Sequence, residues 1–560
     1  ELTDDWAFLR RVALDTVGRV PLPVEIDAFQ KDKKPGRRAR VIERFLNDDL
    51  GWADHWTSYW QDVLAENPNI LKPMLNNTGP FRFWIHESLQ DNKPMDRFVT
   101  ELVMMEGSKH YGGPAGFAMA TQNDVPMAAK AQVLAQAFLG RQMKCARCHD
   151  APFHDFNQKD LFGIAAMLQQ SPLAVPKTSS VPPLPDGRKP RVEVSLKPGS
   201  KVPPAWPFAK PLSEPIYSNS RAQLAAHITD PAGDRFAKVI VNRVWKRYLG
   251  WGFVEPVDDW SEAEPSHPRL LDWLARQFVE SGYDLKHVAR LILNSHAYQR
   301  QIDPASIKPR KATDRLFAGP ARRRLSAEQI VDSLFTVSGK AMGMELLTLD
   351  VDGRRPVTTF LNLGSPRRAW EFTSLSNERD RPALAIPKVQ SVVDVLKNFG
   401  WRDARQDAIT ARDESPNVLQ PAILLNGIIG KRATQLSEDS AFTALALEDI
   451  DTKAMIEKLY LRVLSRPPTD KEAALFFDHI CQTFAFRVVK DAKPATRHVK
   501  VHAVSWSNHL HADATRIKLE LERLAREGDP PTARLRAPWR ESFEDVVFAL
   551  INSPEFIFVP

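Results

Sequence analysis

Two of the three cysteines in the chain lie three residues apart, in the sequence KCARCH at residues 144–149. C-x-x-C-H is the spacing at which c-type haem is attached to protein. Each thiol can add to one of the two vinyl groups of a porphyrin, and the adjacent histidine then lies under the ring as the proximal ligand of the iron. The motif therefore predicts that Cys145 and Cys148 hold one haem c and that His149 is the metal ligand.

Other uses of the same cysteine pair stay open. A thioredoxin-like redox pair needs a preceding βαβ pattern, whereas the run before Cys145 has a helical pattern. Zinc needs four nitrogen or sulfur ligands, and no second C-x-x-C is present, although His154 with Asp150 or Asp155 would complete an irregular site. A disulfide between Cys145 and Cys148, or no chemistry at all, are the remaining alternatives.

The motif does not fix the ligand on the opposite, distal face of the haem. A methionine or a second histidine would give a six-coordinate electron carrier, whereas an empty position would leave the iron open to a small molecule. His154 follows the motif too closely to reach the distal face, so we expect it to support the site from behind. An enzyme with an open iron would use His55, His154 or Arg147. The other distal candidates are His110, Met104, Met105, Met119, Met127, Met143 and Met167. Core packing is the simpler explanation for each methionine.

The composition is that of a globular protein. The 560 residues are 43% hydrophobic and 26% charged, which excludes wholesale disorder, collagen-like repeats and a coiled-coil rod. No stretch approaches the ~18 consecutive apolar residues that a membrane-spanning helix needs. A chain of this length with three cysteines is not a disulfide scaffold, and we expect Cys481 to be a small buried apolar residue.

Basic residues exceed acidic ones, which gives a formal charge of +7. Two denser runs, residues 31–38 and 308–311 with 322–324, could attract an acidic glycan, a lipid headgroup or an acidic redox partner. We interpret both runs as solvated faces instead. No module that reads nucleic acid is recognisable, so nucleic acid is not an expected partner.

Helical periodicity dominates the chain, so the predicted fold class is mainly α, a multi-helical chain of two domains. A helical domain that carries the motif covers residues 1–170, and a second mainly helical domain covers 219–560. Between them, 171–218 is a Pro-rich β insert or linker, in which residues 192–196 alternate like a strand. A short hairpin is expected near 346–363.

Two local signals are sharper than the general pattern. Asp4 and Asp5 are typical helix caps, and the helix that follows them should end at Gly18. The dipeptide Asp352-Gly353 is a candidate turn for the hairpin.

A second group of histidines lies near the C-terminal end, at His498, His502, His509 and His511. His498 and His502 are four residues apart, so on a helix they would share one face and could bind a metal together. No HExxH-type glutamate accompanies them, and we favour a solvated polar face.

Further short motifs are spread over nearly the whole chain. In the N-terminal part they are FLRRVALD at 8–15, GRVP at 18–21, DHW at 54–56, FLG at 138–140, the cysteine motif and PF at 152–153. In the C-terminal part they are VNRVW at 241–245, GFVEPVDD at 252–259, SHP at 266–268, LILNS at 291–295, RRLSAE at 323–328, LLN at 424–426 and NSPEF at 552–556. With these motifs the chain resembles secreted planctomycete and verrucomicrobial proteins that pair two domains of unknown function and are described as planctomycete cytochrome c-like.

The resemblance implies an exported protein of the cell envelope. It also implies a link to polysaccharide use, through the genes that accompany this family in genomes, and it implies no settled reaction. The chain starts at Glu1 without an apolar leader, which we interpret as a mature product whose export signal is missing from view. Many relatives carry a second histidine two residues after the motif histidine. Ala151 stands at that position here, so a role of that histidine does not transfer to this chain.

The leading hypothesis is a periplasmic c-type haem protein that acts in electron transfer or redox chemistry linked to polysaccharide breakdown. It would work with a redox partner protein and, as a further possibility, polysaccharide. One alternative is a haem enzyme with an open iron site that acts on a carbohydrate-related substrate. Another is a non-redox envelope scaffold or glycan-binding protein with a Cys145–Cys148 disulfide.

Overall fold

The computed structural model divides the chain into two compact units, and each unit is made of segments that are far apart in sequence. The first unit comprises Glu1–His55, Arg322–Asp403 and Arg412–Pro560, and the second comprises Trp56–Ala321 and Ala404–Ala411. The structure describes all residues except 67–78, 108–112, 118–124, 182–184, 186–187, 189–190, 209–218, 261–262, 303–310, 312–313, 344–346, 349–361, 365, 376–386, 404, 406 and 495–509.

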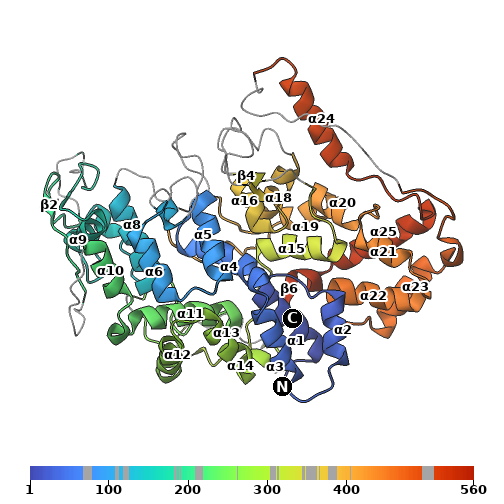
Figure 1. Cartoon of the computed structure of the whole chain (residues 1–560), viewed down its shortest axis with the longest axis horizontal. Coiled ribbons are helices and arrows are strands. Elements are labelled where there is room, and N and C mark those ends of the chain that lie inside the picture. The colour runs from blue at the N-terminus through green and yellow to red at the C-terminus, as the bar shows by residue number, and fades with distance from the viewer. Residues whose placement is uncertain are drawn as a thin grey trace. The chain divides into compact units, whose positions relative to one another are not determined.

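The first unit is built mainly from helices (Figure 1), many of which contribute to a large cluster of buried apolar side chains. Its helices of four or more residues are α1 (Asp5–Val17), α2 (Pro23–Lys31), α3 (Arg37–Leu46), α15 (Ala327–Ser338), α16 (Ala369–Leu375), α18 (Pro387–Asn398), α19 (Leu419–Asn426), α20 (Ile428–Thr434), α21 (Ala441–Ala446), α22 (Thr452–Leu464), α23 (Asp470–Ile480), α24 (Ala514–Glu527), α25 (Ala537–Ile551) and the 3-10 helix η9 (Pro554–Ile557). Helix α15 contacts α16, α18, α20 and α21, and its Ile330 and Leu334 are fully buried in the core that these helices share.

Helix α1 begins and ends where the sequence predicts. The Asp4 side chain accepts hydrogen bonds from the N–H groups of Trp6 and Ala7, which satisfies two donors at the start of the helix. Gly18 ends it with a φ of +72°, a left-handed conformation that costs glycine nothing. The buried Arg10 of this helix donates to the Val463 and Phe556 carbonyls, so α1 is fastened to the C-terminal part of the same unit.

Three short antiparallel strand pairs complete the described secondary structure. In the first unit, β3 (Arg323–Arg324) pairs with β6 (Phe558–Val559), and β4 (Leu347–Thr348) pairs with β5 (Asn362–Gly364). The second of these pairs joins the two ends of the predicted hairpin near 346–363. Its predicted turn at Asp352-Gly353 lies outside the described residues.

The second unit carries the cysteine motif. Its main elements, after the C-terminal part of α4 (Asp49–Val63), are α5 (Gly79–Gln90), α6 (Met95–Met104), η2 (Pro114–Gly116), α8 (Pro126–Leu139), η3 (Cys145–Arg147), α9 (Gln158–Gln169), β1 (Leu173–Ala174), β2 (Lys201–Val202), α10 (Ser220–Ile228), η4 (Pro231–Gly233), α11 (Arg235–Leu249), α12 (Pro268–Glu280), α13 (Leu285–Leu293) and α14 (His296–Gln299). Helix α11 contacts α8, α12 and α13 and is largely buried, so it forms the centre of this unit.

The Pro-rich insert differs from its prediction in one respect. It does contain a small β element, because β1 pairs with β2, but residues 192–196 form no strand. The alternation in this segment is real, since Val192, Val194 and Leu196 are half-buried while the two residues between them are exposed. The chain is extended there, but its hydrogen bonds go to the loop and helix that follow the cysteines instead of to a neighbouring strand.

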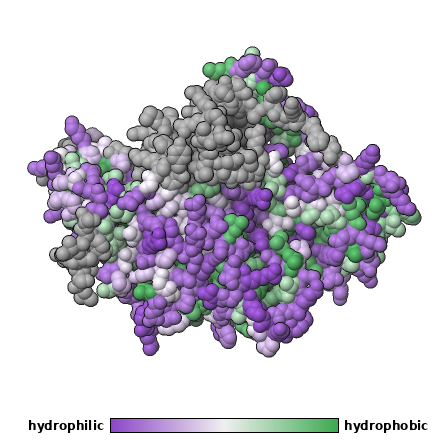
Figure 2. Space-filling view, viewed as in Figure 1, coloured by the Kyte–Doolittle hydropathy of each residue, from purple (hydrophilic) through white to green (hydrophobic). Residues whose placement is uncertain are grey.

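The remaining expectations concern the fold class and the surface. The mainly α prediction is confirmed. No helix among the described residues is long and apolar enough to cross a membrane. On the face drawn in Figure 2, hydrophilic side chains predominate and hydrophobic ones are scattered. The predicted domains at 1–170, 171–218 and 219–560 stay a prediction, because the compact units follow contacts and not chain order.

A short segment from the C-terminal half, Ala404–Ala411, belongs to the second unit. Arg405 is fully buried there, and its Nε donates to Asp62 Oδ1 at 2.5 Å while its Nη1 donates to the Glu66 carbonyl. Glu66 is also paired with the buried Arg82 at 2.8 Å. Since a charge in a protein interior is tolerated only with partners, this network fixes the segment in the unit.

Replacing Arg405 with methionine should destabilise the protein by about 3–5 kcal/mol, because the buried Asp62 carboxylate would lose this cation. Urea unfolding followed by tryptophan fluorescence measures the loss. Arg276→Met, at an exposed position of α12 in the same unit, is the matched control and should change stability by about 0.5 kcal/mol or less. Equal stability of the two variants would show that the segment does not hold the unit together.

Candidate functional site

The helix that leads into the cysteine motif, α8, is held at its C-terminal end by arginines of α11. The last carbonyls of a helix have no partner within it. Arg243, which is fully buried, donates to the carbonyls of Gln136 and Ala137, and Arg235 donates to the carbonyl of Leu139 at 2.8 Å. These contacts give a role to the VNRVW motif, and they fix where α8 ends.

The turn after α8 is equally constrained. Gly140 has a φ of +58°, and a Cβ there would lie 2.7 Å from the Trp260 side chain. The Trp260 N–H donates to the Gly140 carbonyl at 2.8 Å. Only glycine combines the left-handed backbone with this close approach, so it directs the chain from α8 into the motif.

The motif itself forms a single tight turn. Residues Cys145–Arg147 make the 3-10 helix η3, and the N–H groups of Cys148 and His149 both donate to the Cys145 carbonyl, at 3.1 and 3.2 Å. Ala146 is fully buried and anchors the turn, whereas both cysteines are half-buried and their thiols are free. The turn therefore presents two reduced thiols and one imidazole from five consecutive residues.

The imidazole of His149 is held in one tautomer. Its Nδ1 lies 2.7 Å from the backbone carbonyl oxygen of Asp150. A carbonyl can only accept a hydrogen bond, so Nδ1 carries the proton and, in the neutral ring, Nε2 keeps its lone pair. A histidine that donates through one ring nitrogen and binds a metal through the other is the usual arrangement of a metal ligand.

The sequence did not indicate which residues would hold Asp150 in place. The Asp150 N–H donates to the Glu193 carbonyl at 2.9 Å, and its Oδ1 accepts from the Ser195 hydroxyl at 2.7 Å and from the Gln158 N–H at 2.8 Å. Glu193 and Ser195 belong to the extended part of the Pro-rich insert. The only signal in the sequence was the alternation of residues 192–196, which predicts extended chain but not its partner.

His154 lies in the loop behind the motif. Its Nε2 is 3.0 Å from Asp259 Oδ2, and its ring lies beside that of Phe156 at 5.0 Å between centroids. A carboxylate partner of this kind is found both for supporting histidines and for metal ligands, so the supporting role of His154 stays a prediction. Among the described residues, no three or more His, Cys, Asp or Glu side chains are grouped to hold a metal ion. A haem site requires no such group, because the porphyrin itself supplies four nitrogen ligands.

The other predicted candidates are distributed as follows. Met105, Met143 and Met167 are buried, as core packing predicts, whereas Met104, Met127 and Arg147 are half-buried. His55 belongs to the first unit, where it packs against the backbone of Gly18. His110, Met119, His498, His502 and His509 lie outside the described residues, while His511 is exposed at the start of the α24 region.

The donor set fits a haem attached through thioethers. Both thiols are free, and they flank one turn. The neighbouring imidazole would bind iron through Nε2 without a change of tautomer. Cys145 and Cys148 would hold the group and His149 would ligate it.

The described residues of the two basic runs form no second site, and residues 308–310 lie outside the described part of the chain. In the first run, Arg37 and Arg38 both pair with Asp5, and the loop borders an open hollow of the surface. In the second, Arg322 lies over the Phe558 ring and Arg323 pairs with Asp15. The arginines thus contribute to packing, which modifies the expectation of purely solvated faces.

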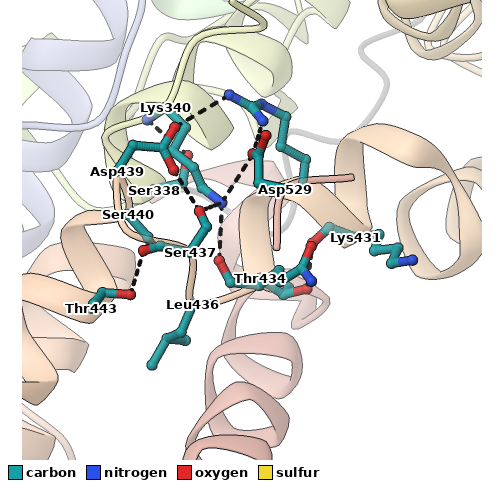
Figure 3. Close-up of polar contacts among 12 residues, drawn as sticks. Ser338, Lys340, Lys431, Thr434, Leu436, Ser437, Asp439, Ser440, Thr443 and Asp529 are labelled. Carbon is teal, nitrogen blue, oxygen red and sulfur yellow. Dashed lines mark hydrogen bonds and ion pairs between the residues drawn. The ribbon is translucent and has the colours of Figure 1, made fainter. Parts of the chain in front are cut away.

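A buried polar cluster in the first unit had no signal in the sequence (Figure 3). Lys340 Nζ donates to the Gln435 carbonyl at 3.0 Å and to Ser437 Oγ at 2.7 Å, and Ser437 Oγ donates to Asp439 Oδ1 at 2.5 Å. A serine between a lysine and a carboxylate resembles a Ser-Lys nucleophile pair. However, Ser437 is 1% exposed and Lys340 is 2% exposed, so a substrate cannot reach the hydroxyl. We interpret the cluster as structural.

Two family models match the chain. Residues 1–172 match PSCyt2, a protein of unknown function (DUF1549), and residues 220–480 match PSD1, a protein of unknown function (DUF1553). The chain pairs two domains of unknown function. The cysteine motif lies in the PSCyt2 match, whose name hints at a cytochrome c-like protein without stating a reaction. No curated protein and no solved structure matches the chain.

The burial of Lys340 predicts a specific pH dependence of stability. Desolvation is the main cause that lowers its pKa to about 8, and Arg432 adds to this while Asp439 opposes it. Between pH 8 and the ordinary lysine pKa of about 10.5, the unfolded chain binds this proton and the folded chain does not. The stability contributed by this residue should therefore rise with pH in that window, by up to about 1.4 kcal/mol per pH unit.

Unfolding of the wild type and of Lys340→Met at several pH values from 7 to 10 tests this. The difference between their unfolding free energies should change with pH in the direction given. Lys431→Met, at an exposed lysine of the nearby α20, is the control for the loss of a surface lysine. A Lys340 difference that does not change with pH would contradict the prediction.

Proposed function

We propose that this chain is a c-type haem protein that carries one covalently attached haem and transfers electrons. The observation that supports this best is the hydrogen bond from His149 Nδ1 to the Asp150 carbonyl, next to two free thiols on the same turn. It leaves Nε2 of His149 ready to ligate iron, and Cys145 and Cys148 ready to form the two thioethers. When bound, the haem supplies one-electron redox chemistry.

Covalent attachment of haem requires both cysteines as free thiols. In each thioether, the S–H bond of a cysteine is added across a vinyl C=C bond: sulfur bonds to one carbon and hydrogen to the other. No oxidant or reductant is used up in this addition. The protein's contribution is to place both thiols on the single η3 turn and, through the hydrogen bond to Asp150, to keep the neighbouring imidazole in the ligating tautomer.

The cellular setting follows from the same chemistry. Attachment of c-type haem is completed outside the cytosol, under controlled thiol redox conditions, so we place the protein in the periplasm or cell envelope. A haem that shuttles electrons needs a redox partner protein. We keep the link to polysaccharide breakdown as the setting that the resemblance implies, and the planctomycete or verrucomicrobial source likewise remains an expectation.

Haem attachment is tested by expression with the c-type maturation machinery and intact-mass analysis. The wild type should gain the mass of one haem and show a Soret band that survives acid-acetone extraction. Cys145→Ser with Cys148→Ser should abolish the covalent haem completely. Cys481→Ser is the matched control, because it removes the third cysteine, which lies in the first unit, and it should retain the haem in full.

The iron ligand is tested in the same material. His149→Ala should keep a covalent link through the cysteines but change the spectrum, because the proximal ligand is gone. A low-spin spectrum that cyanide and carbon monoxide leave unchanged would identify a six-coordinate carrier, whereas a response to either ligand would favour a haem enzyme with an open iron. A wild type recovered as bare polypeptide, or with Cys145 and Cys148 joined in a disulfide, would refute the proposal.

A further inference from the structure

The residue that follows the motif histidine joins three separate parts of the second unit. Asp150 accepts the His149 Nδ1 proton on its backbone carbonyl, and it donates its own N–H to Glu193 of the insert. Its carboxylate oxygen Oδ1 accepts from Ser195 of the insert and from the first N–H of α9, that of Gln158. Backbone and side chain of this one residue are therefore fixed from two directions.

A second residue, Gln158, repeats this cross-link. Its side chain is fully buried, its Oε1 accepts from the Leu196 N–H at 3.1 Å, and its Nε2 donates to the Ser179 carbonyl at 3.3 Å. The insert is thus bound to the start of α9 at both 179 and 196. Cys148 Sγ lies 3.8 Å from the Thr178 carbonyl, so the insert also reaches the second thiol.

From these contacts we infer that Asp150 is a positioning residue for His149 and that the Pro-rich insert, through Glu193 and Ser195, sets the tautomer and orientation of the imidazole. The carbonyl of Asp150 can accept the hydrogen bond from His149 Nδ1–H only while its peptide group keeps its present orientation. That orientation is held by the hydrogen bond to Glu193 and by the two hydrogen bonds to the carboxylate. The consequence for iron rests on the proposed haem function, but the consequence for the tautomer does not.

Loss of the Asp150 carboxylate has a definite chemical effect. Without it, Ser195 and the α9 N–H lose their common acceptor, and the Asp150 peptide is free to turn. The hydrogen bond that the other ring nitrogen makes decides which nitrogen of a neutral imidazole carries the proton. A freed His149 ring would therefore populate the form protonated at Nε2, which cannot bind a metal through that atom.

The tautomer is measured on the full-length protein without haem, with reduced thiols, labelled with ¹⁵N-histidine and held at a pH where the imidazoles are neutral. Long-range ¹H–¹⁵N spectra distinguish a protonated from an unprotonated ring nitrogen, and His149→Gln identifies the His149 signals by their loss. The wild type should show Nε2 unprotonated. Asp150→Ala should move the Nε2 resonance toward the protonated position.

Three further variants make the result specific. Ser195→Ala, which removes one donor to the carboxylate, should shift the resonance in the same direction but less. Asp150→Asn keeps an acceptor oxygen and should restore the wild-type spectrum. If Asp150→Ala fails to fold, Ser195→Ala alone carries the test, and an unshifted resonance there overturns the inference. Asp155→Ala, at an exposed acidic residue of the same loop, should have no effect. Wild-type His149 signals in both Asp150→Ala and Ser195→Ala would overturn the inference.

In the haem-loaded protein the same variants are compared by reduction potential, after covalent haem has been quantified by mass. A hydrogen bond from Nδ1–H makes the imidazole a stronger electron donor and favours ferric iron. Asp150→Ala should therefore raise the potential, and Asp150→Asn should restore it. A wild type without haem would end the proposed function but leave the tautomer result standing. A haem-loaded Asp150→Ala with an unchanged potential would overturn the assigned effect on iron.

Discussion

A guanidinium that is taken out of water must find acceptors for its N–H groups, and this constraint organises the second unit. Arg243 is buried at the centre of α11, and it satisfies itself with two terminal carbonyls of α8 and with the carboxylate of Asp258. Asp258 in turn accepts from the N–H and hydroxyl of Thr410. One cation thereby fixes the end of the helix before the motif and the segment Ala404–Ala411 at once. A hydrophobic residue in the same place would fill the volume but would fix neither.

The buried arginine contacts at the end of α8 also determine where the cysteine motif begins. The last carbonyls of α8 are held by arginines, and Gly140 turns the chain next to Trp260. The backbone that leads into the cysteine motif therefore has a defined position. The short η3 turn then brings both thiols and the imidazole together without any contribution from distant side chains. What distant residues add is the environment of the ring, through the extended part of the insert. The thiols and the imidazole thus come from one short segment, whereas the residues that orient the imidazole come from the insert.

Much of this organisation was readable from the sequence, where the signals are local. The Asp4 cap, the Gly18 stop and the mainly α class follow from residue types at fixed offsets. The two thiols and the imidazole of the site could be identified from the cysteine motif itself, although haem attachment stays a proposal. The partner of residues 192–196 was not predictable, because period-two alternation fixes the conformation of a chain and not what it pairs with. The buried contacts of Arg405 and Lys340 were not predictable either, because their partners lie between 95 and 343 positions away in the sequence.

Each compact unit draws on both matched segments of the chain. The first unit combines residues 1–55 with most of the C-terminal part, and the second combines residues from both matches with Ala404–Ala411. A gene rearrangement that copied one matched segment alone would carry only part of each unit and would expose apolar surface that the other segment covers. The two segments are therefore expected to be inherited together, as a single evolutionary unit, even though sequence comparison counts them as two.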